Sequence, residues 1–290
     1  MAITASDLVL VTGANGHVAQ HVVSQLLSHP SDVRVRGTVR SSSSAQRMQN
    51  IFKSSIISGR LEVVIVPDMT VDGAFDQAIQ GATYVAHIAS PLNLAPKDVE
   101  TDLLIPAING ATSMLKSAMK EPRVKGVVIT SSLVAAFDPQ HGFRPGYTYS
   151  AADWNPITYD EAADPNLDLN QYPEEWRPWI TYMASRKLAE KAAWDFHSKH
   201  MPTWSLSTIL PTFICGPSVL PLEKGAGSLT FSTGLVWRTA TGNEALFHND
   251  FPYWVDVRDV ARAHIQALTL PAAWGKRLIL APQSLLFSDV

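Results

Sequence analysis

The chain has 290 residues, of which 46% are hydrophobic and 17% charged, with a formal net charge of −3 and an isoelectric point near 6.3. These values predict a globular protein with a substantial core, and they exclude the strongly basic surface with which proteins bind nucleic acid or anionic membranes. The first residues show no charged n-region or long apolar h-region, so we expect no secretory signal. No apolar run approaches the about 20 residues that span a bilayer, and the single Cys215 excludes an internal disulfide, so we expect a cytoplasmic protein.

Short β-rich runs alternate with helical segments along the first half of the chain. Strands are predicted over residues 7–13, 33–39, 61–67, 82–89 and 125–132, and helices over 17–29, 43–54, 72–81 and 98–120. Buried strands joined by helical crossovers form a parallel sheet that is covered on both faces. The sequence therefore predicts an α/β fold with a doubly wound parallel sheet of the Rossmann type.

The alternation is interrupted in the second half. Residues 137–179 form an irregular stretch rich in Pro, Asp, Tyr and Trp, and segments of this length in compact domains are commonly functional. A helix from residue 180 and a strand over 203–211 follow, then a second break over 212–228 and a strand-helix pair within 251–268. We expect these late insertions to build a smaller lobe that is discontinuous in sequence.

The segment "VTGANGHVA" places Gly13 and Gly16 directly after the first strand and at the start of a helix. Glycine in this position permits a tight turn and lets the backbone approach a pyrophosphate, which then lies at the positive end of the helix dipole. An ordinary strand-to-helix turn is the alternative, but the position in the first βαβ unit favours a dinucleotide site. The residues expected to contact the dinucleotide here are Gly13, Asn15, Gly16, His17 and Val18.

The end of the second strand, "VRVRGTVRSS", has Arg40 and lacks the acidic residue that would bind an adenosine ribose 2′-hydroxyl. A guanidinium suits a 2′-phosphate, so the segment favours NADP(H) over NAD(H). Arg47 on the next helix would assist, although a solvated helix face explains it equally well. Asp68 and Met69 follow the third strand, where an adenine ring would lie, and Asp68 is equally consistent with a helix N-cap.

Nine motifs in chain order resemble those of the extended short-chain dehydrogenase/reductases. They are "VTGANGHVAQHVV", "VPDMTVDGAFDQAI", "HIASPL", "LLIPAINGATSML", "VVITSS", "DWNPITYDEA", "YMASRKLAEKAAW", "CGPS" and "WVDVRDVARAH". The most similar group is the NADPH-dependent aldehyde and ketone reductases, including methylglyoxal-reductase-like enzymes, which are related to dihydroflavonol and cinnamoyl-CoA reductases. The resemblance covers nearly the whole chain and implies a small-molecule carbonyl substrate.

The resemblance also implies roles for particular residues. The serine of "ITSS" that binds the substrate carbonyl is placed on Ser132, with Ser131 as the alternative, and Tyr182 becomes the proton donor. His87 and His264 are expected to be structural, since no carboxylate at helical spacing completes a triad with them. The further residues expected at the cofactor are Ala89, Ser90, Pro211, Thr212, Phe213 and Ser232.

A phenol has a pKa of about 10 and needs a nearby cation to transfer a proton readily near neutral pH. The family pattern is Tyr-x-x-x-Lys, whereas this chain has Arg186 four residues after Tyr182 and Lys187 five residues after it. On a helix the fourth residue lies on the same face and the fifth is turned away, so Arg186 is the expected partner. Arginine is bulkier and planar, so the exchange is not conservative. Taken alone, the stretch is better explained as an amphipathic helix with both cations in water, and only the rest of the chain favours the catalytic interpretation.

The resemblance implies that residues 1–290 form a single extended short-chain dehydrogenase/reductase unit with two parts. A cofactor-binding part would comprise mainly residues 6–137, 180–215 and 252–268, and a substrate lobe mainly 138–179, 216–251 and 269–290. The family segment that matches the end of the chain is normally followed by further helices and strands, so we expect the lobe to be truncated at Val290. We expect a monomer or a homodimer.

The leading hypothesis is an NADPH-dependent reductase of aldehydes or ketones. A second hypothesis is an NADP(H)-binding protein of the same fold with weak or no redox activity, acting as a sensor, a scaffold or a non-redox catalyst, because Arg186 replaces the lysine. A sugar-nucleotide epimerase or dehydratase uses the same triad, but those enzymes generally retain NAD, which Arg40 disfavours. No His/Cys cluster has the spacing of metal ligands, so we expect no metal.

Overall fold

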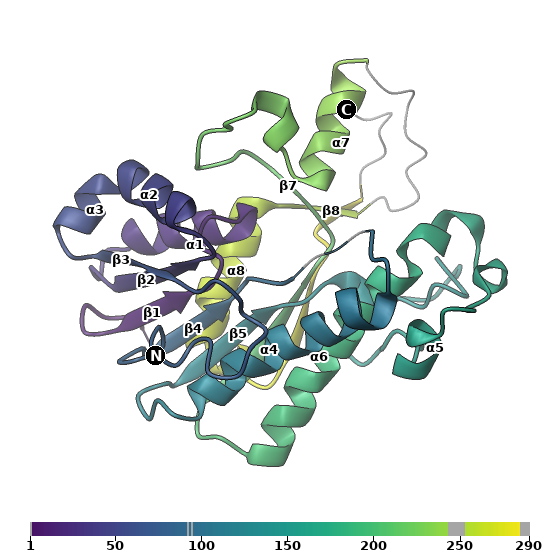
Figure 1. Ribbon diagram of the computed structural model, residues 1–290, viewed down its shortest axis with the longest axis horizontal. Helices are drawn as coiled ribbons and strands as arrows, with labels where there is room; N and C mark the ends of the chain where they lie inside the picture. The colour runs from purple at the N-terminus through teal and green to yellow at the C-terminus, as the bar shows by residue number, and fades with distance from the viewer. Residues whose placement is uncertain (1, 92, 94, 243–252, 285–290) are drawn as a thin grey trace.

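A seven-stranded parallel sheet forms the centre of the molecule (Figure 1). The computed structural model describes residues 2–91, 93, 95–242 and 253–284. The strands lie in the order β3-β2-β1-β4-β5-β6-β9, so the chain winds outward in both directions from β1 and confirms the expected doubly wound fold. Their bounds are β1 Leu8–Val11, β2 Arg34–Val39, β3 Leu61–Ile65, β4 Tyr84–His87, β5 Gly126–Thr130, β6 Ser205–Pro211 and β9 Arg277–Leu280.

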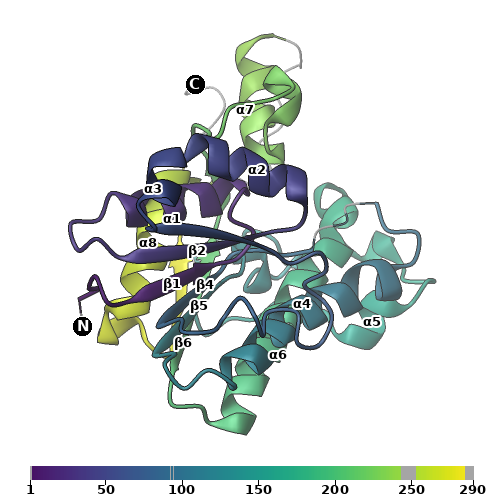
Figure 2. The same cartoon turned by 60° about the vertical axis from the view of Figure 1, so that its left-hand side comes forward.

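Helices cover both faces of this sheet. Helices α1 (His17–Leu27) and α8 (Val257–Thr269) pack on one face, and α4 (Ile105–Ala118) and α6 (Ile180–His200) on the other, as Figure 2 shows from the side. The central strands β1, β4 and β5 are almost wholly buried because apolar side chains from both helix layers pack against them. Helices α2 (Ser42–Ile51) and α3 (Lys53–Ile57) connect β2 to β3 beside the first layer.

A second, smaller sheet lies beyond the carboxyl ends of the main strands. It contains β7 (Phe213–Cys215), β8 (Tyr253–Asp256) and β10 (Gln283–Ser284), with α7 (Phe231–Ala240) beside it. The long segment after β5 holds only short elements. One of them, α5 (Tyr159–Ala163), begins with a capping box between Thr158 and Glu161. Strand β9 falls within residues 269–290 and extends the main sheet, because it pairs in register with β6.

One predicted helix does not form. Residues 72–81 make a series of turns whose backbone bonds are mostly three residues apart, such as Asp76 N–H to Gly73 O and Ala82 N–H to Ile79 O. Gly73 and Gly81 have φ values of +78° and +75°, which a right-handed helix does not accommodate. The apolar side chains that suggested a helix are nevertheless buried against the sheet, including Phe75 and Ile79. Within the described ranges, none of the helices has the length and apolar character needed to cross a membrane.

Candidate active site

The glycine turn lies where the chain reverses direction in the sheet, between the carboxyl ends of β1 and β4. Gly13 has φ +62°, and a Cβ placed there would lie 3.0 Å from the Cβ of Ala89, so only glycine fits this close approach. Gly16 is the N-cap of α1 and has no side-chain cap, which leaves the first N–H groups of the helix without a side-chain partner. Crevices of this kind bind dinucleotides in doubly wound sheets, and the turn fits a pyrophosphate.

The other three residues of this turn differ in their surroundings. Asn15 donates a hydrogen bond of 3.5 Å to Ser44 on α2, and Val18 is packed into the core. The His17 Nε2 atom is buried without a hydrogen-bond partner among the described residues. Burial and the neighbouring His21 lower the pKa of His17 to about 4, so its ring is neutral at physiological pH.

The two arginines expected to recognise a 2′-phosphate are placed differently. Arg40 follows the carboxyl end of β2, is exposed, and forms no ion pair with any residue that the structure describes. Arg47 on α2 donates to the carbonyl of Pro221 and pairs with Glu223, with Nε 3.4 Å from Oε1. Arg40 is therefore available to a ligand, whereas Arg47 holds the segment that follows β7.

Asp68 and Met69 follow β3 as expected. The Asp68 carboxylate accepts hydrogen bonds from the Thr70 backbone N–H at 2.8 Å and hydroxyl at 2.7 Å, and these bonds lower its pKa. The residues after it form turns, so the alternative of a helix N-cap does not hold. The Met69 side chain packs against α4, where its Cε lies 3.1 Å from the position that a Cβ on Gly110 would occupy.

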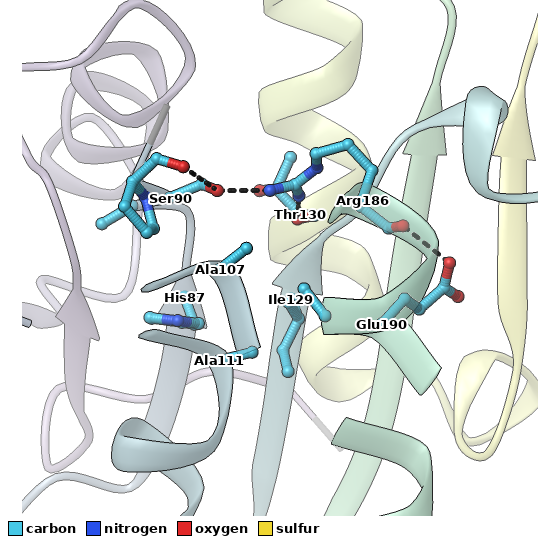
Figure 3. A pocket seen from close by; sticks show the side chains of 12 residues that line it. His87, Ser90, Ala107, Ala111, Ile129, Thr130, Arg186 and Glu190 are labelled. Atoms are coloured by element: carbon cyan, nitrogen blue, oxygen red, sulfur yellow. Dashed lines mark hydrogen bonds between the residues drawn. The ribbon is translucent and has the colours of Figure 1, made fainter. Parts of the chain in front are cut away.

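Helix α6 places Tyr182 and Arg186 one turn apart on the same face and turns Lys187 away. The Arg186 guanidinium donates to the Thr130 carbonyl at 2.7 Å and to the Ser90 hydroxyl, so it lies across the carboxyl ends of β4 and β5 (Figure 3). The Lys187 ammonium donates instead to the carbonyl of Ile157 at 2.7 Å, and burial lowers its pKa. The helical spacing thus predicted the correct faces for the two cations.

The two serines after β5 have separate partners. The Ser131 hydroxyl donates to the buried carboxylate of Glu190 at 2.6 Å. Ser132 has extended backbone angles, φ −157° and ψ 153°, and its oxygen accepts only a long bond of 3.4 Å from the Val134 N–H among the described residues. Successive side chains on an extended backbone alternate, so the Ser132 side chain leaves the chain on the side opposite to that of Ser131.

The two histidines near the site, His87 on β4 and His264 on α8, are buried, and each lies within hydrogen-bond distance of a threonine. The Thr12 hydroxyl lies 3.0 Å from His87 Nδ1, and the Thr130 hydroxyl lies 2.7 Å from His264 Nε2. Burial lowers the pKa of each to about 4, and for His87 the Arg186 charge adds to this. Both rings are therefore neutral at physiological pH, in agreement with a structural role.

The carboxyl end of β6 leads into an aromatic wall. Thr212 donates to the Leu280 carbonyl at 3.2 Å, and the Ser232 hydroxyl donates to the Ile214 carbonyl at 2.5 Å, so this serine is engaged within the protein. Pro211 is the last residue of β6, and Phe213 in β7 has its ring 5.1 Å from Trp254. On α6, the Tyr182 ring is 6.4 Å from Trp179, whose ring is 5.2 Å from Phe231.

Sequence reasoning missed a buried ion pair next to the site. Glu190 of α6 and Arg277 of β9 have side chains that are only 1% and 7% exposed, with Arg277 Nε 2.8 Å from Glu190 Oε1. The available signal was the position of Glu190, eight residues after Tyr182 and between the small residues of "LAEKAA", on the face of α6 that had to be buried. Within the described part of the chain, no group of three or more His, Cys, Asp and Glu side chains has the arrangement of a metal site.

Comparison with known proteins agrees with this architecture. The model of the 3-beta hydroxysteroid dehydrogenase/isomerase family matches residues 10–145. A putative NADPH-dependent methylglyoxal reductase of Candida albicans is 34% identical over 283 residues, which are 96% of this chain and 79% of that protein. Aldehyde reductase 2 of Sporidiobolus salmonicolor is 36% identical over 279 residues, 94% of this chain and 76% of that one.

Solved structures give the same result. The yeast methylglyoxal/isovaleraldehyde reductase in complex with NADPH superposes with a TM-score of 0.78 at 32% identity, covering 94% of this chain and 78% of that one. An identity above 30% over most of both chains shows that they belong to one family and do not share the fold alone. The chain therefore belongs to the extended short-chain dehydrogenase/reductases, in the group of NADPH-dependent aldehyde and ketone reductases.

Proposed function

We propose that this protein reduces an aldehyde or ketone to the alcohol with NADPH. The observation that carries the proposal is the placement of Tyr182 and Arg186 on one side of α6, with the Arg186 guanidinium bonded to Ser90 and Thr130 at the carboxyl edge of the sheet. This edge contains the glycine turn, so a phenol and a fixed cation lie beside the expected dinucleotide. Relatives named as NADPH-dependent reductases support the same activity.

The cofactor would be held by groups along the whole edge. The turn at Gly13 and the open start of α1 would receive the pyrophosphate, and Arg40 would pair with the 2′-phosphate. Ala89 and Ser90 after β4, and Pro211 to Phe213 after β6, would border the nicotinamide half. Arg47 would join Arg40 only by leaving Glu223. The nicotinamide, when bound, supplies the hydride to the carbonyl carbon.

The residues of the chain would stabilise the charge that develops on the substrate oxygen. Ser132 is the serine we assign to the carbonyl, because the Ser131 hydroxyl is bonded to Glu190. Tyr182 would donate the proton, and Arg186 would supply the positive field that stabilises the resulting phenolate. The division into a cofactor part and a substrate lobe follows from this assignment, with the aromatic wall around Trp179 and Phe231 facing the substrate.

A second candidate function rests on the bonds of Arg186. Its guanidinium is occupied by Ser90 and Thr130, whereas the family lysine is a compact ammonium. If arginine does not support proton transfer by Tyr182, this geometry favours a protein that binds NADP(H) without transferring hydride.

The two candidates are separated by one experiment. NADPH oxidation is followed at 340 nm against aldehydes, diketones and keto esters, with NADPH affinity measured by fluorescence titration on the same preparation. We expect turnover with at least one class, near-complete loss of turnover in Tyr182→Phe and Ser132→Ala, and NADPH affinity within about threefold of the parent in both. Tight NADPH binding without turnover on the whole panel would favour the second candidate.

A further inference from the structure

The carboxylate of Glu190 is the centre of a buried polar network. It accepts hydrogen bonds from Arg277 Nε at 2.8 Å, Thr208 Oγ1 at 2.7 Å, Ser131 Oγ at 2.6 Å and, more weakly, Trp194 Nε1 at 3.3 Å. These donors come from β9, β6, the end of β5 and α6 itself. Four elements that meet below the active site are therefore tied to one carboxylate.

Stability alone does not explain a charged pair at this place. Removing two charges from water is costly, and well-packed apolar side chains often stabilise a core equally well. The Arg277 guanidinium also extends beyond Glu190, because its Nη1 donates to the carbonyls of Ala151 and Asp153, and its centre lies 3.6 Å from the middle of the Trp154 ring. The pair thus connects the catalytic helix to the irregular segment that follows β5.

The bond to Ser131 relates this network to the reaction. Ser131 and Ser132 are adjacent, and the backbone at Ser132 is extended. The bond from the Ser131 hydroxyl to Glu190 anchors the backbone at this point, and from this backbone the Ser132 side chain leaves on the opposite side. Glu190 is also four residues after Arg186 and eight after Tyr182, so one side of α6 carries all three groups.

We propose that Glu190, oriented by Arg277, is a positioning residue that fixes the direction of the Ser132 hydroxyl relative to Tyr182 and Arg186. This inference rests on the proposed reductase function. Glu190 acts through Ser131 and touches neither substrate nor cofactor. Its contribution is geometric, and a misplacement of a catalytic group by about 1 Å lowers turnover by roughly 100-fold in other enzymes.

The test uses Ser131, because removing one member of a buried ion pair is strongly destabilising. Ser131→Ala deletes the link and leaves the ion pair intact, whereas Ser131→Thr keeps a hydroxyl. Ser207→Ala is the matched control: Ser207 is also buried in the sheet, and its hydroxyl makes one hydrogen bond of 2.7 Å, to the Ala273 carbonyl. Both alanine variants lose one buried hydroxyl bond, so their melting temperatures should fall by similar amounts.

We expect Ser131→Ala to lower kcat at least tenfold, with KM and NADPH affinity within about threefold, while Ser131→Thr and Ser207→Ala keep kcat within about twofold. Equal kcat values in Ser131→Ala and Ser207→Ala would overturn the inference.

Crystal structures of the parent and both alanine variants with NADPH test the positioning role of Glu190 independently of any activity measurement. The Ser132 hydroxyl should change direction in Ser131→Ala only, and an unchanged direction would sink the inference. A parent that binds NADPH but reduces no carbonyl would refute the proposed function, and the direction of Ser132 in the crystals would still decide whether Glu190 positions it.

Discussion

Replacing Arg186 by lysine and by methionine tests whether the cation beside Tyr182 supports catalysis. Arg186→Met removes the charge and keeps most of the stem, so the phenol loses its positive neighbour. General acid-base catalysis contributes about 10²- to 10⁴-fold, and we expect kcat to fall by up to that amount in Arg186→Met. Arg186→Lys should raise kcat above that of the parent, because a compact ammonium with three donors can approach both Tyr182 and a ribose.

Arg186→Lys should lower the stability of the fold even though it raises kcat. The guanidinium makes two hydrogen bonds, to Ser90 and to the Thr130 carbonyl, and a single ammonium does not span both. A hydrogen bond to a charged group is worth about 1.5–3 kcal/mol, and we reduce this to about 1–2 kcal/mol because Arg186 is only half-buried and its charge is screened by solvent. At about 2–4 °C per kcal/mol, Arg186→Lys should melt roughly 2–8 °C lower than the parent.

Lys187 offers a control at the next position of the same helix. Lys187→Met removes a half-buried ammonium that donates to the Ile157 carbonyl, so we expect a lower melting temperature with kcat within about twofold of the parent. Kinetics are measured as NADPH oxidation at saturating cofactor, and melting by scanning fluorimetry. Equal kcat values for Arg186→Met, Lys187→Met and the parent would refute the assignment of Arg186 to the site.

The remaining predictions concern the cofactor edge and the buried histidines. Arg40→Asp should weaken NADPH binding about ten- to 100-fold and NADH binding little, since only NADPH carries the 2′-phosphate; Arg34→Asp, at the other end of β2, should weaken neither, and equal losses for both cofactors in Arg40→Asp would remove Arg40 from the site. Gly13→Ala should lower NADPH affinity at least tenfold and destabilise more than Gly59→Ala, because both glycines have positive φ, at +62° and +73°, but only the Cβ at Gly13 meets a neighbour; calorimetry and melting curves check this, and equal effects would contradict it. His87 and His264 have folded pKa values of about 4 against an ordinary 6.5, so the unfolded state binds more protons between these values, and the neutral burial of each histidine contributes about 3 kcal/mol of stability that is present above pH 6.5 and lost as the pH falls toward 4. Urea unfolding between pH 7 and pH 4 should therefore show a shallower loss of stability in His264→Gln than in the parent, and parallel curves would count against this account.

The sequence by itself determined the features that depend on neighbours along the chain. Alternating strands and helices predicted the doubly wound sheet, because βαβ units impose parallel strands with helices on both faces. Gly13 and Gly16 identified the turn at the centre of the sheet. The φ of +62° at Gly13, and the clash that a Cβ there would make with Ala89, explain why this residue is glycine. The four-residue spacing also assigned Arg186, and not Lys187, to the face of Tyr182.

Tertiary structure decided what depends on residues far apart in the sequence. The Ser131 hydroxyl is bonded to Glu190, 59 positions away, and our proposed assignment of Ser132 rests on this bond; Arg47 is bonded to Pro221, 174 positions away. Local pattern also misjudged residues 72–81, whose apolar side chains are buried by turns that two positive-φ glycines permit. Periodicity reports which side chains are buried, but the partner that a buried polar group finds is set by the packing of whole elements, and the Glu190–Arg277 pair becomes visible only when β9 is placed beside β6.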